Sequence, residues 1–403
     1  MKGLNVLKRF LIACSLGLGV GYADVLPNYL SSDKNKLFQY EFQLNNAKSN
    51  VLENGWINPV ILQYSKNFSE QYTDKKVISS SFSVGIDQPI FRSGGIYFAI
   101  KYAQAVRGAN DVQITLQKQQ MIGQAVKLLF DIEKLGLEKE KLALLILNNK
   151  LDIRQKREHY QSGILASSFL DQALLQANLN ETKMLEMNIA LQTLYEQFSL
   201  LSDADPKALK LPHLKLISQK LYQSKNLEVV REKLRAKEKH YSAQMTWAKY
   251  MPSVSLQGRY VDNDVAASLR IPGQEERYMR YGFTISMPLN VNMFSDIEAS
   301  KVARLKAETE VIERKRAVEE EYRMVIRRLK MVEQKIKLAK QDAKLYGRLY
   351  RQTRDLEKIG EKTYLDTRMM YQSLKIRKLD QKIYKIEKQI ELIGLYVKVE
   401  NAI

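Results

Sequence analysis

Residues 318–350 read VEEEYRMVIRRLKMVEQKIKLAKQDAKLYGRLY. Apolar side chains recur in this stretch in alternating steps of four and three residues. All ten positions of the repeat are apolar: Val318, Tyr322, Val325, Leu329, Val332, Ile336, Ala339, Ala343, Tyr346 and Tyr350. A spacing that averages about 3.5 residues is typical of helices that pack as coiled coils. The stretch therefore predicts a long helix that packs lengthwise against another helix.

The same spacing occurs in two other parts of the chain. After Gly360, nine of ten positions are apolar: Leu365, Met369, Ile376, Leu379, Ile383, Ile386, Ile390, Ile393 and Val397, with Gln372 as the exception. In the first half the pattern is carried by Leu128, Ile132, Leu135, Leu142, Ile146, Ile153 and Tyr160. Leu338 and Leu345 lie off the main stripe, so we expect a helix that packs against two neighbours. Helices over 96–158 and 300–358 would be about 95 and about 90 Å long, which suits a tube better than a compact enzyme.

Four segments are predicted to be strands: 57–69, 79–91, 252–262 and 278–290. In the last, Tyr281, Phe283 and Ile285 alternate with small polar residues, and a period of two indicates a half-buried strand. Two interpretations are open. The alternation alone favours a sheet packed on a soluble core, whereas a membrane barrel would place the polar face in a wet lumen. Because single-chain barrels begin at about eight strands, a barrel would need several subunits.

The order of these segments indicates a duplicated chain. Three pairs of residues recur at nearly one spacing: Pro59 and Pro252 are 193 apart, Pro89 and Pro288 are 199 apart, and Gly163 and Gly360 are 197 apart. Each half is predicted to contain a helix, two strands, a very long helix, a glycine turn and a helix. We expect the first repeat over 24–201, a connector over 202–223 and the second repeat over 224–403.

The N-terminus indicates export. Basic residues flank an apolar run over 10–21, and small residues precede Ala23, so residues 1–23 are predicted to be a secretory signal. Leu11-Ile12-Ala13-Cys14 resembles a lipoprotein cleavage box, and lipidation at Cys14 remains the second interpretation. No later apolar run approaches the length of about 20 residues that a spanning helix needs.

Composition excludes several classes of protein. The balance of 64 basic and 45 acidic residues gives a net charge of +19, which suits an anionic partner, and export excludes nucleic acid as that partner. One Cys and three scattered His residues (His159, His213 and His240) cannot form a Cys/His zinc site or a disulfide framework. We find no catalytic motif, and we expect a non-enzyme without cofactor or metal.

Taken together, the signal, the strand pairs with their prolines (Asp87-Gln88-Pro89-Ile90-Phe91 and Ser286-Met287-Pro288-Leu289) and the two glycine turns resemble the TolC family. The resemblance covers nearly the whole mature chain. It implies an α+β membrane protein whose long coiled-coil helices form an α-helical barrel. A homotrimer would complete a β-barrel, with four strands from each protomer.

The resemblance also implies a location and a function. The protein would lie in the outer membrane of a Gram-negative bacterium, in contact with its lipid, and extend into the periplasm. It would be the passive channel-tunnel subunit of a tripartite efflux or type I secretion system, with a periplasmic adaptor and an inner-membrane transporter of RND or ABC type. The alternative is a periplasmic coiled-coil adaptor or scaffold.

Site residues follow from the same resemblance. The adaptor would dock on the two glycine turns: Gly163, Ile164, Leu165, Gly360, Glu361 and Lys362. The periplasmic aperture would be formed by Asp366, Lys362 and Glu361. Met369 replaces a second family aspartate, and Phe169 stands where the first half usually has one. Asp171 could substitute for it only if the first turn were longer than the second.

These turn residues also have a purely structural interpretation. Thr363 and Asp366, like Ser168 and Asp171, have the spacing of an N-terminal capping box. Glycine is a common helix stop because it adopts the left-handed conformation easily.

Overall fold

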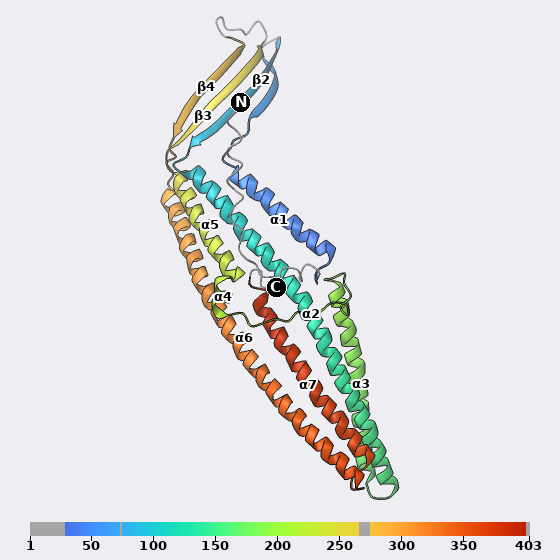
Figure 1. The fold of residues 1–403 in the computed structure, drawn as a ribbon. Coiled ribbons are helices and arrows are strands. Elements are labelled where there is room, and N and C mark those ends of the chain that lie inside the picture. Colours follow the sequence, from blue (N-terminus) through green and yellow to red (C-terminus); the bar gives the residue numbers. More distant parts are fainter. Residues whose placement is uncertain (1–28, 73–74, 266–274, 400–403) are drawn as a thin grey trace, which may run out of the picture. The chain divides into compact units, whose positions relative to one another are not determined.

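The computed structural model describes residues 29–72, 75–265 and 275–399. The predicted signal (1–23) and Cys14 lie outside these residues. In chain order the elements are α1 (Ser32–Glu53), β1 (Ile61–Tyr72), β2 (Lys75–Phe91), α2 (Gly95–Gln161), α3 (Ser167–Ser199), α4 (Gln219–Ser224), α5 (Leu227–Lys249), β3 (Ser253–Val265), β4 (Arg277–Ser286), α6 (Met293–Lys358) and α7 (Tyr364–Tyr396) (Figure 1).

Helix lengths match in pairs along the chain. α2 and α6 have 67 and 66 residues, α3 and α7 have 33 each, and α1 and α5 have 22 and 23. Residues 202–218 form no helix or strand. The long helices are those expected, although α6 begins at Met293, seven residues before the predicted start.

Two compact units are present, and each combines parts of both sequence halves. One contains the described parts of Met1–Asn35, Gln119–Ile217 and Val325–Ile403, and we call it the hairpin unit. The other contains Lys36–Lys118 and Ser218–Met324, and we call it the sheet unit. Residues of α2 and α6 belong to both units.

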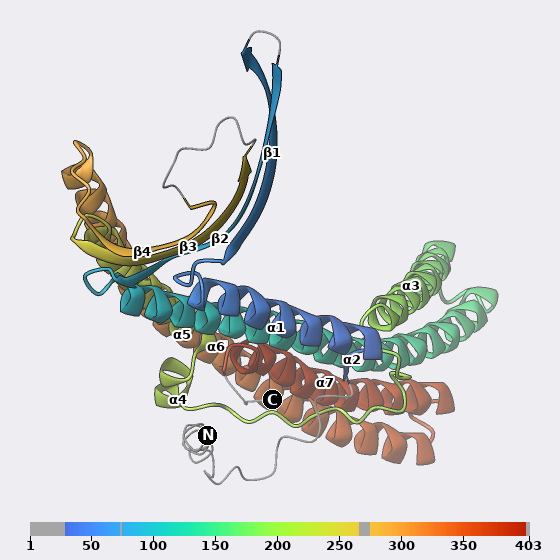
Figure 2. The same cartoon turned by 90° about the horizontal axis from the view of Figure 1, so that it is seen from above.

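The sheet unit contains an antiparallel sheet in the order β1-β2-β3-β4, which is curved (Figure 2). Its helices follow the order α1, α2, α5, α6. Asn45 of α1 donates to the Arg107 carbonyl of α2 at 3.0 Å, Arg231 of α5 donates to Gln113 of α2 at 2.7 Å, and α5 pairs with α6 through Glu228. The helices therefore keep the order of the strands that they adjoin.

Prolines explain two of the strand boundaries that differ from the predicted ones, the start of β1 and the end of β4. β1 begins at Ile61, after Pro59, and β4 ends at Ser286, before Pro288. Proline has no N–H to donate to the ladder, so it is confined to strand ends, edges and bulges. Pro89 lies inside β2, but at a register shift between Pro89 and Phe91.

One face of the sheet is apolar and uncovered. Cross-strand pairs place Leu62, Val84, Tyr260 and Met279 in one row across the four strands. The large apolar side chains of this face are between 39% and 83% exposed: Leu62, Tyr64, Phe68, Ile78, Phe82, Ile86, Leu256, Met279, Tyr281, Phe283 and Ile285. We call this surface the apolar sheet face. Among the described residues, no element covers this face as the soluble-core interpretation would require.

The predicted heptad stripe forms the helical cores. In the hairpin unit, Leu329, Val332 and Ala339 of α6 and Ile376, Leu379 and Ile383 of α7 are all buried. Gln372, the polar exception, is buried as well. The off-stripe residues Leu338 and Leu345 are exposed, so none of the described helices covers them as the second neighbour expected for α6. None of the described helices combines the length and the apolar character needed to cross a membrane.

Candidate functional site

Two interhelical turns of the hairpin unit contain most of the predicted site residues. Gly163 and Gly360 have φ of 75° and 82°, the left-handed conformation expected of a helix stop. The Gly163 N–H donates to the Tyr160 carbonyl and the Ile164 N–H to the His159 carbonyl. Equivalent bonds link Gly360 to Glu357 and Glu361 to Leu356. Both helices therefore end in a Schellman motif, which satisfies carbonyls of the last turn.

The second turn continues into a complete capping box. The Asp366 N–H donates to the Thr363 hydroxyl at 3.1 Å, and the Thr363 N–H donates to Asp366 Oδ2 at 3.0 Å. Partial burial alone would raise the pKa of Asp366. The Thr363 hydrogen bonds, the Lys362 charge and the Gln155 amide outweigh that effect and hold its pKa below the usual value. Asp366 is thus an ionised helix cap at neutral pH.

The first turn has no such box, contrary to the prediction for Ser168 and Asp171. α3 begins at Ser167 with Ala166 as its N-cap, and no side chain caps it. Both turns have five residues between their helices, 162–166 and 359–363, so the first is not longer. Phe169 therefore occupies the position of Asp366, and Asp171 does not substitute for it.

The remaining predicted residues lie at the surface of the two turns. Glu361 and Lys362 are exposed, and Ile164 is exposed with Leu165 half-buried. A Cβ added at either turn glycine would meet no described atom within 4 Å. The turns are therefore accessible, and substitution at their glycines would strain the backbone without a steric clash.

A polar seam joins α2 to α7, and the sequence analysis did not anticipate it. Its four contacts are Gln155–Asp366 at 3.5 Å, Asn148–Ser373 at 3.3 Å, Lys141–Asp380 at 2.6 Å and Lys134–Glu387 at 3.1 Å. The α2 residues descend by seven while the α7 residues ascend by seven, as antiparallel helices require. We call this set the polar ladder. The sequence pattern that could have predicted it is a polar residue at every seventh position of each helix, beside the apolar stripe.

The polar ladder is incompletely satisfied. Asn148 Oδ1 and Gln372 Oε1 are buried and make no hydrogen bond within the described residues. Such atoms cost about 1–3 kcal/mol each when they are left without a partner. On its other side, α7 meets α6 through the buried apolar stripe and exposed ion pairs such as Lys388–Glu333 at 2.7 Å. Both seams of α7 therefore contain polar contacts, and the α2–α7 seam differs in that buried polar atoms there lack a partner among the described residues.

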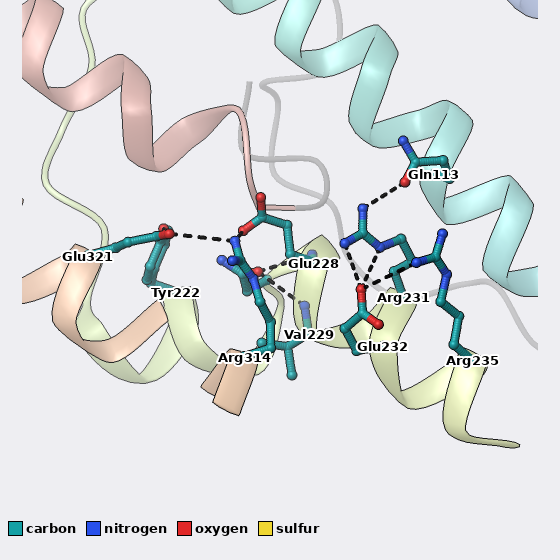
Figure 3. A network of polar contacts seen from close by, with 10 residues as sticks. Gln113, Tyr222, Glu228, Val229, Arg231, Glu232, Arg235, Arg314 and Glu321 are labelled. Carbon is teal, nitrogen blue, oxygen red and sulfur yellow. Dashed lines mark hydrogen bonds and ion pairs between the residues drawn. The ribbon is translucent and has the colours of Figure 1, made fainter. Parts of the chain in front are cut away.

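A polar network in the sheet unit fastens the α4–α5 corner to α6 (Figure 3). Asn226 caps α5 by accepting from the N–H groups of Glu228 and Val229. Arg314 of α6 pairs with Glu228 and with Glu321, which also accepts from the Tyr222 hydroxyl at 3.5 Å. Burial and then the Glu321 charge raise the pKa of Tyr222 well above its usual range. The charges of this corner neutralise one another, which indicates a structural role.

No cluster of three or more His, Cys, Asp or Glu side chains that could hold a metal ion occurs among the described residues.

The chain is similar to known proteins in structure but matches none of those compared in sequence. No protein-family model matches the chain, and no curated protein matches it in sequence. The outer membrane protein VceC of Vibrio cholerae matches with a TM-score of 0.73 at 13% identity, over 91% of this chain and 93% of that one. The outer membrane channel CmeC of Campylobacter jejuni matches with a TM-score of 0.72 at 13% identity, over 93% and 86%. The MtrE outer membrane channel of Neisseria gonorrhoeae, in its open state, matches with a TM-score of 0.63 at 12% identity, over 89% and 85%.

The chain has the TolC fold. Identities this low establish the fold and leave the activity to be argued from the residues. The family resemblance is confirmed at the level of one chain, as long helices with a small antiparallel sheet, and the turns of the hairpin unit belong to a TolC-type helical region.

The capping box gives a pH-dependent prediction. Because the pKa of Asp366 is lower in the folded state, its stabilisation is present above the unfolded pKa of about 3.9 and is lost as the pH falls through the folded pKa. We expect Asp366→Asn to lower the melting temperature of the detergent-purified protein at neutral pH, with the difference vanishing at an acidic pH below the folded pKa of Asp366. An equal difference at both pH values would contradict this role of the carboxylate.

The uncapped turn supplies the matched control. Ala166 has φ −70° and ψ 149°, close to the −87° and 159° of Thr363. Thr363→Ala should therefore cost about 1 kcal/mol, and Ala166→Thr should stabilise the protein by a similar or smaller amount.

The polar ladder gives a second prediction. Lys141→Met would leave the buried Asp380 carboxylate with only the Arg377 contact at 3.3 Å, so we expect a loss of about 1–3 kcal/mol in the free energy of unfolding. The double variant Lys141→Met/Asp380→Leu should recover most of that loss, because no buried carboxylate remains and Arg377, which also loses its carboxylate partner, is 36% exposed. Lys382→Met, at an exposed position of α7, is the control. Equal losses in the single and double variants in urea unfolding would refute the pairing.

Proposed function

We propose that this protein is the outer-membrane channel subunit of an export system, in which three copies form a β-barrel that continues into a helical tunnel. Substrates would pass through it passively from an inner-membrane transporter, of RND or ABC type, and a periplasmic adaptor. The observation that carries the proposal is the apolar sheet face.

The composition of this face suits lipid. Its large exposed side chains are aliphatic or aromatic, with Lys66 as a charged exception in β1. The opposite face of the same strands carries mostly Ser, Gly, Gln and Thr residues, together with charged residues such as Arg259 and Arg280. Asp262 and Arg277, which pair at 3.2 Å, end the face near the β3–β4 hairpin. Val254 and Asp262 are eight residues apart in β3, about 27 Å along the strand. A tilt of about 40° would give an apolar band about 21 Å high, close to the ~25 Å of outer-membrane barrels.

The edges of the sheet support assembly from several copies. β1 and β4 each pair with one strand only among the described residues. Lipid offers no hydrogen bonds, so an open edge in a membrane must be completed by another strand. Because four strands are too few to close a barrel, several copies are needed, and the resemblance to the TolC family implies three copies with twelve strands.

Exposed apolar residues on the helices favour the same assembly. Met324, Met331, Leu338 and Leu345 of α6 are exposed and recur every seven residues. A heptad stripe that no helix of the chain covers is suited to a helix of a second copy. The alternative function, a periplasmic adaptor or scaffold, leaves the apolar sheet face without a partner.

Asp366 supplies the proposed aperture. Three copies near the channel axis would form an anionic ring, with Lys362 and Glu361 beside it, and such rings favour cations. Because Phe169 and Met369 replace the usual carboxylates, each chain contributes one aspartate to the ring. Capping and gating are compatible roles, since the capping box leaves Asp366 Oδ1 only the long contact to Gln155.

The test of this function is ion conduction in planar lipid bilayers. We expect purified protein to conduct, and Asp366→Asn to weaken its cation selectivity. Asp171→Asn removes a carboxylate that lies outside the proposed ring and serves as the matched control. Absence of conductance would contradict the channel, while conductance with unchanged selectivity in Asp366→Asn would leave Asp366 only its capping role.

The two Schellman turns are the proposed docking sites for the adaptor. A leucine at Gly163 or Gly360 would add left-handed strain of about 1–2 kcal/mol and a side chain on an open surface. Since the turns have equal length, we expect equal strain at both positions. Each variant should assemble normally and lose capture of the adaptor in pull-down assays. Capture of the adaptor at the wild-type level by both variants would place docking elsewhere.

A further inference from the structure

A cavity of about 730 Å³ lies in the sheet unit where strands give way to helices. It is formed by the ends of α1 and α5, the start of α2 and the first residue of β3. Its apolar lining includes Val51, Leu52, Trp56, Ile96 and Met245. The volume falls within the ~300–1,000 Å³ typical of small-molecule sites.

Two cations and no carboxylate line this cavity. Arg92 is exposed, and its guanidinium makes no hydrogen bond or ion pair within the described residues, although its backbone carbonyl accepts from the Gly95 N–H at 2.7 Å. Lys249 reaches Asp296 only at 4.0 Å, and its side chain is 66% exposed. An apolar chamber with two available cations has the chemistry of a site for an anionic amphiphile.

The backbone around Arg92 is held in place. The Ser93 hydroxyl donates to the Pro252 carbonyl at 2.7 Å, which ties the end of β2 to the start of β3. Ser93 has φ of 46°, and Gly94 has φ of 85°. A serine in the left-handed region is uncommon and persists only where its surroundings fix it. The site is therefore built by the fold and does not depend on a loose loop.

The cavity adjoins the end of the sheet, next to residues of the apolar sheet face. Arg92 directly follows Phe91, the last residue of β2, and Phe91 pairs with Val254 on that face. The two tryptophans of the chain, Trp56 and Trp247, stand five and six residues before β1 and β3. Tryptophan is enriched at the boundary between lipid and water. The cavity thus lies at the level where the proposed membrane band ends.

From these observations we infer that the cavity binds an anionic phospholipid of the inner leaflet. One acyl chain enters between Trp56, Leu52 and Met245, and the headgroup phosphate lies between Arg92 and Lys249. This inference rests on the proposed function, because it requires the apolar sheet face to lie in a membrane.

The test uses tryptophan fluorescence and brominated lipids. In a Trp247→Phe background, Trp56 is the one tryptophan of the chain. The protein is reconstituted into vesicles of phosphatidylcholine with a minor fraction of phosphatidylglycerol. Bromine is carried either by the phosphatidylglycerol or by the same amount of phosphatidylcholine, so that lipid composition stays constant. We expect stronger quenching of Trp56 when phosphatidylglycerol carries the bromine.

Substitutions identify the source of that preference. Each of Arg92→Gln and Lys249→Gln should reduce the preference for phosphatidylglycerol by about fivefold, and the double variant should abolish it. Lys48→Gln, at an exposed position of α1 outside the cavity, is the matched control and should change nothing. Ala99→Phe, which fills the cavity from α2, should weaken quenching by both lipids.

One further variant separates the inference from the proposed function. With Trp56 and Trp247 both replaced by Phe, Tyr281→Trp reports on the apolar sheet face, where both brominated lipids should quench equally. If they do not quench it, the proposed membrane location is wrong. The lipids could instead quench Tyr281→Trp while Trp56 shows no preference for phosphatidylglycerol, or no quenching because a second copy covers the cavity. Either result would refute the lipid site and leave the proposed channel intact.

Discussion

The apolar side chains of the sheet are not covered by any described helix, so they need an apolar environment. This requirement constrains the rest of the molecule. The strands carry one largely apolar face and one polar face that includes Arg259 and Arg280, so the two sides of the sheet need different solvents. Backbone groups at the edges of β1 and β4 must be paired if those edges lie in lipid. Closing the sheet into a barrel with further copies of the chain would pair these edges and separate lipid from water. It would also cover the second apolar stripe of α6.

The helical seams differ in chemistry, which bears on how the hairpin unit could move. Buried aliphatic residues at heptad spacing join α6 to α7, and such packing is costly to separate. The polar ladder joins α7 to α2 through ion pairs and hydrogen bonds that water could replace at lower cost.

The sequence predicted the long helices, the order of the strands and the left-handed glycines, because each depends on local spacing or on one residue type. It misplaced the start of α3: Ser168 and Asp171 have capping chemistry, but the turn geometry makes Ala166 the N-cap. The sequence did not predict the polar ladder, because Lys134 and Lys141 look like residues of a solvated helix face until the position of the partner helix is known. The cavity proposed to bind lipid is lined by residues from four separate elements. Their proximity in the fold cannot be predicted from their spacing along the chain.

The central claim is that the apolar sheet face lies in lipid, and a spin-label scan along β4 tests it most directly. Labels would be placed one at a time from residue 278 to residue 286 in protein reconstituted into liposomes. The account predicts that odd positions are accessible to dissolved oxygen and even positions to a water-soluble relaxation agent, with a period of two. High accessibility to the water-soluble agent at both sets of positions would contradict it.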